Sequence, residues 1–212
     1  MSVNLVAQLP DEIAARRQPR GRVEVRDDLF CDGLAQKLFE TVAWVPVYII
    51  NRNERYKSHE LDIHWYYPLA VTDDPDHDDV EPELRNLDET LSPIVETWDR
   101  IRSAIGYDVR LYECMISANT FGTEGHPHYD INNRKLGINH LLALVYCNPK
   151  WELAWAGETV FFDESGEISD AVIPRPGRVV IAHGDPLHVG RSVSRICPYD
   201  RRVLVFKMWR TQ

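Results

Sequence analysis

Apolar and polar residues alternate with a period of two through most of the chain from Arg110 onward, and Gly, Pro and Asn residues separate the alternating runs. Because successive side chains of a β-strand point to opposite faces, this pattern predicts short strands with one buried face. Many short strands of this kind indicate a structure built on antiparallel sheet. The predicted strands cover residues 110–117, 126–130, 138–147, 158–162, 178–182 and 201–209.

The first half of the chain shows helical spacing as well. Ser92 is the expected N-cap of a helix with Pro93 at its first position, and Asp32 is the expected cap of an earlier helix. The two apolar stripes are Leu34, Leu38 and Val42, and then Ile94, Trp98, Ile101 and Ile105. Residues 44–72 are rich in aromatic and β-branched residues and predict strands or extended loops. Together these patterns predict a mainly β fold with helices flanking one face of an antiparallel sheet.

Length and composition fit one folded domain. The chain has 212 residues, of which 44% are hydrophobic and 27% charged, so it can bury one core but is short for two. We therefore expect a single domain over residues 1–212, with residues 1–20 as a flexible leader. No apolar run is long enough for a signal peptide or a membrane span, which predicts a cytoplasmic protein without a membrane partner.

Net charge and cysteine spacing argue against nucleic-acid binding, a zinc ribbon and a disulfide-rich fold. The net charge of −9 argues against a nucleic-acid partner, because phosphate binding needs a basic surface. The four cysteines are far apart and form no C-x-x-C pair, so neither a zinc ribbon nor a disulfide framework is indicated.

Two segments carry candidate metal ligands, GHPHYDINN and AHGDPLHVGRS. His128 and Asp130 in the first segment are two residues apart, so on a strand they would share a face. Two histidines and one carboxylate would leave coordination positions open, as in non-haem Fe(II) oxygenases. H-x-D alone is a common sequence, and its meaning depends on the residues around it.

Those surroundings resemble the 2-oxoglutarate-dependent dioxygenases, in particular the prolyl-hydroxylase-like branch. The resemblance covers about residues 110–209 and consists of several elements in the family's order. They are ANTFGTEGHPHYD, LVYCNPKW, AGETVFF, PRPGRVVIAHG, LHVGRSV and RRVLVFKMW. The resemblance implies a double-stranded β-helix, or jelly-roll, over residues 110–209. It also implies Fe(II) bound by His128, Asp130 and His188, with 2-oxoglutarate and O2 as co-substrates.

The resemblance further implies a basic residue on the last strand that binds the distal carboxylate of 2-oxoglutarate. Arg201 and Arg202 compete for this role. Alternation places Arg201 on the face of Val203 and Val205, and the family has small residues on the interior face of this strand. Arg201 is therefore the expected anchor, since a guanidinium grips a carboxylate with two hydrogen bonds. Tyr146 matches the family position whose phenol also reaches that carboxylate.

Other ligand sets remain open. His183 is a rival for the distal ligand, although His188 precedes Val-Gly as the family's ligand does. His126 and His128 form the H-x-H pair of a cupin-type site, but no Glu follows within a few residues. Three hypotheses therefore remain: a 2-oxoglutarate oxygenase, a cupin-like metalloenzyme that does not use 2-oxoglutarate, and a non-catalytic ligand-binding barrel.

The substrate is the least constrained part of the prediction. A small metabolite or natural-product intermediate, hydroxylated at an unactivated C–H bond, is expected rather than a protein, with a peptidyl residue as the alternative. Asp130 stands where halogenating relatives have Gly or Ala, which argues against halogenation but leaves desaturation and ring formation open. Residues 47–80 and the rim near Trp151 and Trp155 are expected to contact the substrate. The oligomeric state stays open.

Overall fold

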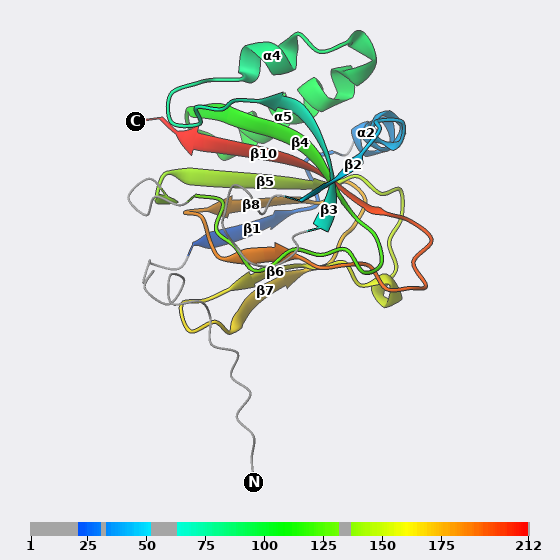
Figure 1. Ribbon diagram of the computed structural model, residues 1–212. Helices are drawn as coiled ribbons and strands as arrows, with labels where there is room; N and C mark the ends of the chain where they lie inside the picture. The colour runs from blue at the N-terminus through cyan, green and yellow to red at the C-terminus, as the bar shows by residue number, and fades with distance from the viewer. Residues whose placement is uncertain (1–20, 31–32, 52–62, 132–136, 212) are drawn as a thin grey trace.

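The computed structural model describes residues 21–30, 33–51, 63–131 and 137–211, and within it the chain forms two antiparallel sheets. Figure 1 shows the helices on one side of the larger sheet and strands of the smaller sheet, β6 and β7, on the other side. The larger sheet has seven strands in the order β1-β8-β5-β10-β4-β3-β2, and the smaller has three in the order β7-β6-β9. Two facing antiparallel sheets with this strand content form a jelly-roll, as expected from the sequence.

The strands of the larger sheet come from the whole length of the chain. Their bounds are β1 Arg22–Arg26, β2 Tyr48–Asn51, β3 Ile63–Val71, β4 Val109–Asn119, β5 His140–Tyr146, β8 Val179–His183 and β10 Arg201–Arg210. The strands of the smaller sheet are β6 Thr159–Phe162, β7 Ile168–Val172 and β9 His188–Gly190. The predicted strands at 110–117, 138–147, 158–162, 178–182 and 201–209 are confirmed, with ends that differ by a few residues.

Three α-helices and two short 3-10 helices complete the described chain. Their bounds are α2 Leu34–Ala43, α4 Glu81–Arg85, η1 Glu89–Leu91, α5 Ser92–Ile105 and η2 Leu153–Trp155. The predicted stripes of α2 and α5 supply Leu38, Val42 and Trp98 to a core between the helices and the outer face of the larger sheet. A second core fills the space between the sheets and includes Met115, Phe161 and Val205.

Strand β10 lies in the middle of the larger sheet and contributes to both cores. Val203 and Val205 face the smaller sheet, whereas Leu204, Phe206 and Met208 face the helices. This alternation is the one predicted from the sequence. It also turns two charged residues of β10, Arg201 and Lys207, towards the space between the sheets, where both are buried.

Several predictions of local structure were wrong. Residues 126–130 do not form a strand, because pairing there is limited to a single isolated bridge at His128, next to Pro127, which has no N–H to donate. Ser92 is the first residue of α5, and Leu91 is its N-cap. The N-cap of α2 is Gly33, in the left-handed conformation, and Asp32 lies outside the described residues. Strands β7 and β9 were not predicted, and the leader expected over residues 1–20 also lies outside the described part.

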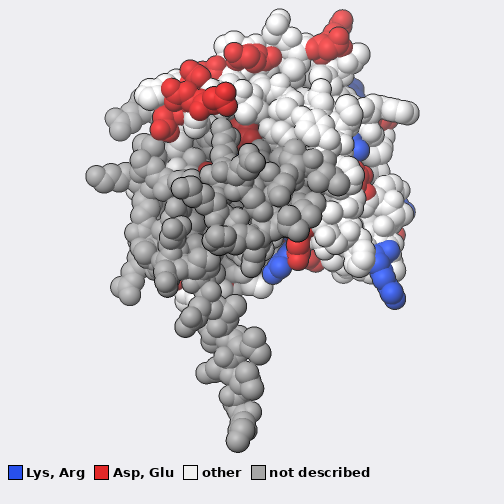
Figure 2. All heavy atoms as spheres, in the orientation of Figure 1, with Lys and Arg blue, Asp and Glu red and all other residues white. Residues whose placement is uncertain are grey.

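The surface reflects the negative net charge of the chain. Figure 2 shows acidic side chains along the upper edge of the visible face, in the region of α4 in Figure 1. Asp73, Asp74 and Asp76, in the segment that leads to α4, are exposed, as predicted for an acidic surface loop. Among the described helices, none has the length and apolar character required to cross a membrane.

Candidate metal centre

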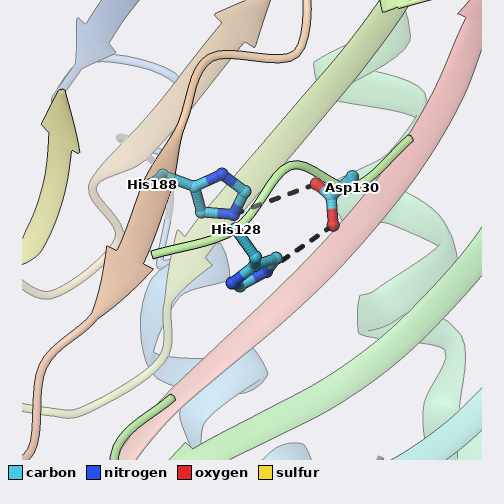
Figure 3. Close-up of side chains that lie close together, drawn as sticks. All are labelled: His128, Asp130 and His188. Carbon is cyan, nitrogen blue, oxygen red and sulfur yellow. Dashed lines mark ion pairs between the residues drawn. The ribbon is translucent and has the colours of Figure 1, made fainter. Parts of the chain in front are cut away.

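His128, Asp130 and His188 come together between the sheets, and their side chains point toward one another (Figure 3). Nε2 of His128 lies 3.9 Å from one carboxylate oxygen of Asp130, and Nε2 of His188 lies 3.9 Å from the other. His128 and His188 also form an antiparallel backbone bridge, with N–H···O distances of 2.9 and 3.0 Å. The bridge aligns the segment before Asp130 with β9, so residues far apart in the sequence present their donor atoms to one point.

Both imidazole rings are oriented by backbone carbonyl groups. Nδ1 of His128 lies 2.9 Å from the carbonyl oxygen of His126, and Nδ1 of His188 lies 3.0 Å from that of Pro186. A carbonyl oxygen only accepts, so each Nδ1 carries the proton and each Nε2 keeps its lone pair for a ligand. Burial, together with the nearby His128, lowers the pKa of His188 to about 4. At neutral pH His188 is therefore uncharged, as a metal ligand must be.

The carboxylate of Asp130 is held on one side by a buried lysine. Lys207 on β10 places its Nζ 2.7 Å from Oδ1 of Asp130 and 3.1 Å from a carboxylate oxygen of Glu113. Oδ2 of Asp130 is buried and has no hydrogen-bond partner among the described residues. Burial is the largest single influence and would raise the pKa of Asp130, but Lys207 and the neighbouring histidines together outweigh it and the net shift is downward. Asp130 is thus an ionised carboxylate with one oxygen left for a cation.

A second buried group lies next to Asp130. Asp185 accepts hydrogen bonds from the backbone N–H groups of Asp130 and Ile131, at 2.8 and 3.2 Å. Nδ1 of His140 lies 3.8 Å from Asp185, and Nε2 of His140 is hydrogen bonded to the hydroxyl of Tyr112 at 2.8 Å. Burial, and then the charge of Asp130, raise the pKa of Asp185 to about 7, whereas burial lowers the pKa of His140 to about 4.

Arg201 occupies the other end of the same interior face of β10. Its guanidinium donates to Oδ1 of Asn119 at 3.1 Å and to Oγ1 of Thr159 at 2.6 Å. Within the described part of the chain no carboxylate lies at ion-pair distance, and Nε of Arg201 is buried without a hydrogen-bond partner. Burial lowers the pKa of Arg201 below its usual value. A buried, uncompensated cation is costly and indicates a site for an anion.

The aromatic ring of Tyr146 packs against the guanidinium of Arg201. The centre of its ring lies 5.2 Å from Cζ of Arg201, and its hydroxyl lies 2.7 Å from Oγ1 of Thr159. The hydroxyl also donates to the carbonyl oxygen of Val172 at 3.3 Å. One set of donors fits all of these contacts: Arg201 donates to Thr159, Thr159 to Tyr146, and Tyr146 to Val172. Tyr146 therefore fixes Thr159, which in turn fixes Arg201.

Space for the Arg201 side chain depends on Gly157. This residue has a φ of 80°, and a Cβ built on it would lie 3.0 Å from Trp151 and 3.1 Å from Cδ of Arg201. Any other residue would be strained in its backbone and crowded by both side chains. Trp151, expected at the rim, thus lies close to Arg201. Trp155 is buried, with its ring centre 5.7 Å from that of Trp151.

The competing candidates lie elsewhere. Arg202 points toward the helices, where it donates to the carbonyl oxygens of Val42 and Val45 and pairs with Asp200. His183 ends β8 and lies 3.1 Å from the hydroxyl of Tyr107, outside the groups with metal-ligand spacing. His126 orients the ring of His128 through its carbonyl oxygen. The imidazole of His126 is not a member of the group with metal-ligand spacing, which consists of His128, Asp130 and His188 among the described residues.

Five residues of this region were not predicted from the sequence. They are Glu113, Asn119, Thr159, Asp185 and Lys207. Charged residues inside alternating runs resemble surface residues, so the sequence offers little signal for Glu113 or Lys207. A weak signal existed for Lys207, since it shares the parity of Arg201 on one strand. The contact partners of the other three depend on strand pairing and loop geometry that no local pattern specifies.

Comparisons with known proteins agree with this architecture. No protein-family model matches the sequence, and a search of curated proteins also finds no match. Among solved structures, a 2OG-Fe(II) oxygenase family oxidoreductase from Burkholderia pseudomallei is similar with a TM-score of 0.66 and 13% identity, over 95% of this chain and 91% of that one. The chain has the fold of the 2OG-Fe(II) oxygenases.

Further structures with this oxygenase fold are similar over most of their length. A prolyl-4-hydroxylase from Pseudomonas putida has a TM-score of 0.59 and 16% identity, over 95% of this chain and 96% of that one. HygX from Streptomyces hygroscopicus, solved with nickel and 2-oxoglutarate bound, has a TM-score of 0.55 and 13% identity, over 89% of this chain and 83% of that one. The jelly-roll and its prolyl-hydroxylase-like relatives therefore agree with the resemblance stated from the sequence.

Proposed function

We propose that the protein is a non-haem Fe(II) oxygenase that consumes O2 and 2-oxoglutarate. The observation that carries this proposal is the convergence of His128, Asp130 and His188 in a 2OG-Fe(II) oxygenase fold. Two imidazole nitrogens and one carboxylate oxygen suit a first-row divalent metal and leave further coordination positions open for other ligands.

The free donor atoms favour a bound cation at this point. The Nδ1 atoms of both histidines are engaged by carbonyl groups, and Oδ1 of Asp130 is engaged by Lys207. The atoms that remain are two Nε2 atoms and the buried Oδ2 of Asp130, which has no hydrogen-bond partner in the described chain. These residues would hold iron, with His128 as the most exposed ligand.

Iron, when bound, supplies the activation of O2 that is coupled to oxidative decarboxylation of 2-oxoglutarate. The protein's own part is to bind, orient and exclude water. Arg201 would bind the carboxylate of 2-oxoglutarate that is remote from the metal, because it is buried and has no carboxylate partner among the described residues. Tyr146 and Thr159 would hold the guanidinium in place, and the Tyr146 phenol would lie beside the same carboxylate.

The proposed reaction is hydroxylation of an unactivated C–H bond. Its proposed substrate is a small metabolite or a natural-product intermediate rather than a protein. A peptidyl residue is the competing substrate class, since one of the similar structures is a prolyl-4-hydroxylase. Asp130 would supply a carboxylate as the third ligand, which favours an oxygenase outcome over halogenation.

The test is formation of succinate from 2-oxoglutarate by the purified protein with Fe(II), with and without candidate substrates. We expect succinate that depends on both Fe(II) and O2, and an increase with the correct substrate. A screen over amino acids, peptides, sugars and cyclic natural-product precursors would identify the substrate class. Turnover of a substrate without 2-oxoglutarate would favour the cupin-like alternative. Absence of both metal and 2-oxoglutarate binding would favour a binding barrel.

A further inference from the structure

We propose that Asp185 is a positioning residue of the metal centre, which fixes the backbone of the H-x-D segment so that Asp130 presents Oδ2 to the ion. The inference rests on the proposed function, because it concerns the same metal. Asp185 would not touch the ion itself. Its role would be to set the position of Asp130 before metal arrives.

The contacts between Asp185 and the H-x-D segment are direct. One carboxylate oxygen accepts the N–H of Asp130 at 2.8 Å, and the other accepts the N–H of Ile131 at 3.2 Å. Asp185 is only 6% exposed, so water competes little for these oxygens. Two hydrogen bonds from successive peptide groups to one carboxylate fix both the position and the direction of the chain at Asp130.

A fixed backbone matters here because the segment has little other regular structure. Residues 126–130 belong to no strand, and their pairing is the single bridge at His128. The bridge at His128 fixes the segment on the N-terminal side of Asp130. Asp185 supplies the fixed point on the other side.

Asp185 adopts an unusual backbone conformation to make these contacts. Its φ is 53°, in the left-handed region, which costs a residue other than glycine on the order of 1 kcal/mol. Gly184 before it has a φ of 82°. This tight turn directs the carboxylate of Asp185 inward, where its hydrogen bonds offset the strain.

The same turn also helps to fix the positions of the other two candidate ligands, His128 and His188. Pro186, the next residue, orients the His188 ring through its carbonyl oxygen. His188 in turn holds the backbone of His128 through the bridge. A single short loop therefore positions all three candidate ligands, and Asp185 is its connection to Asp130.

Asp185 also belongs to a second group with metal-ligand spacing, together with Asp130 and His140. Positioning is the better reading, because both oxygens of Asp185 already accept peptide N–H groups and Oδ1 of Asp130 already contacts Lys207. The two readings differ in stoichiometry. Positioning predicts one metal per chain, whereas a ligand role predicts two.

The experiment is a calorimetric titration of the full chain with nickel(II), a redox-stable substitute for Fe(II). We expect one nickel ion per wild-type chain. Asp185→Asn keeps the size of the side chain but replaces one accepting oxygen with an NH2 group, which cannot accept an N–H. We expect its Kd for nickel to rise about 10–100-fold, the usual effect of losing a residue that orients a ligand. Circular dichroism at the titration temperature checks that the variant is folded.

Asp88→Asn is the matched control. Asp88 also accepts a backbone N–H, that of Thr90 at 2.9 Å, but it lies at the start of η1. We expect its Kd for nickel to equal that of the wild type. An unchanged Kd in Asp185→Asn would overturn the inference. Two nickel ions per wild-type chain, falling to one in the variant, would overturn it in favour of a ligand role.

A measurement on the wild type removes the dependence on folding of the variant. Amide hydrogen exchange of Asp130 and Ile131 should already be slow in the metal-free protein, because Asp185 holds both N–H groups. Fast exchange that slows only after nickel binds would contradict the inference, since the metal would then order the segment. If the wild type binds no divalent metal at all, the proposed function fails. If it binds normally and only the Asp185 results disagree, the inference alone fails.

Discussion

Arg201 and Lys207 lie on the same face of β10 and are both buried between the sheets, yet their charges are balanced differently. Lys207 pairs across the sheet with Glu113 and also contacts Asp130, whereas Arg201 pairs across the sheet with Asn119. No carboxylate of the described residues reaches Arg201. One strand thus carries a compensated cation near the candidate metal centre and an uncompensated one at its other end, where an anionic co-substrate would complete the charge balance.

Replacement of Arg201 should raise the requirement for 2-oxoglutarate steeply. Loss of one partner from a buried charge pair costs about 3–5 kcal/mol, which corresponds to about a hundredfold or more in affinity. We expect Arg201→Ala to raise the apparent KM for 2-oxoglutarate by this factor, and Arg201→Lys to be intermediate because it loses the fork geometry. Arg202→Ala is the control, and should lower thermal stability with little change in KM. A large KM effect in Arg202→Ala alone would reverse the assignment.

His188→Ala should abolish iron-dependent succinate formation, while His183→Ala should retain most of it. His183 ends β8 and its ring lies beside the hydroxyl of Tyr107, whereas His188 begins β9 and its ring lies with His128 and Asp130. We expect His128→Ala and Asp130→Ala to be inactive as well. Activity and nickel affinity, measured for all four variants, check this prediction. The reverse order for His183 and His188 would move the distal ligand to His183.

Lys207→Met should destabilise the metal-free protein by about 3–5 kcal/mol in free energy of unfolding, because it leaves Asp130 and Glu113 buried without their cation. Saturating nickel should recover part of this loss, since the ion supplies positive charge next to Asp130. Urea unfolding with and without nickel measures both effects. Lys150→Met, at an exposed position, serves as the control. Equal stabilisation by nickel in wild type and Lys207→Met would argue against a shared charge balance.

His140 should make the metal-free protein less stable on the acid side of neutrality. Burial lowers its pKa from 6.5 to about 4, so between these values the unfolded chain binds a proton that the folded protein does not. The free energy of unfolding therefore falls as the pH drops from 6.5 to 4, by about 3 kcal/mol from this residue.

His140→Phe should reduce this acid-side loss, as measured by urea unfolding between pH 4 and 7.5. His77 provides a control of opposite sign. It is exposed, and its hydrogen bond to Asp74 raises its pKa, so the stability it contributes is lost as the pH rises. An identical pH profile for wild type and His140→Phe would show that His140 is not held neutral in the fold.

Much of the fold could be predicted because burial imposes a regular period on the sequence. The strands of the core and the stripes of α2 and α5 follow from this period. Strand β9 could not be predicted in the same way, since three residues are too few to show alternation, although one of them is His188. The pairing that defines β9 comes from β6 and from the bridge to His128, both distant in sequence.

The candidate site was predictable in its residue types but not in its geometry. His128 and Asp130 were expected to share a face of one strand, and this reason was wrong, because their segment is irregular. Their side chains differ in burial, at 46% and 2% exposed, and they converge through the backbone bridge at His128 and the clamp from Asp185. The roles of Lys207 and Glu113 depend on the pairing of β10 with β4, which the sequence alone does not specify.

The backbone bridge between His128 and His188 also bears on which ions the site can accept. Hydrogen bonds in the main chain hold the two backbones together, and the centres of the two rings lie 4.6 Å apart. A small first-row ion binds imidazole nitrogen at about 2.0–2.1 Å. Calcium prefers oxygen ligands at about 2.3–2.6 Å and in larger number. The two imidazole donors therefore favour a small first-row ion over calcium, and the main-chain bridge is what brings these two donors together.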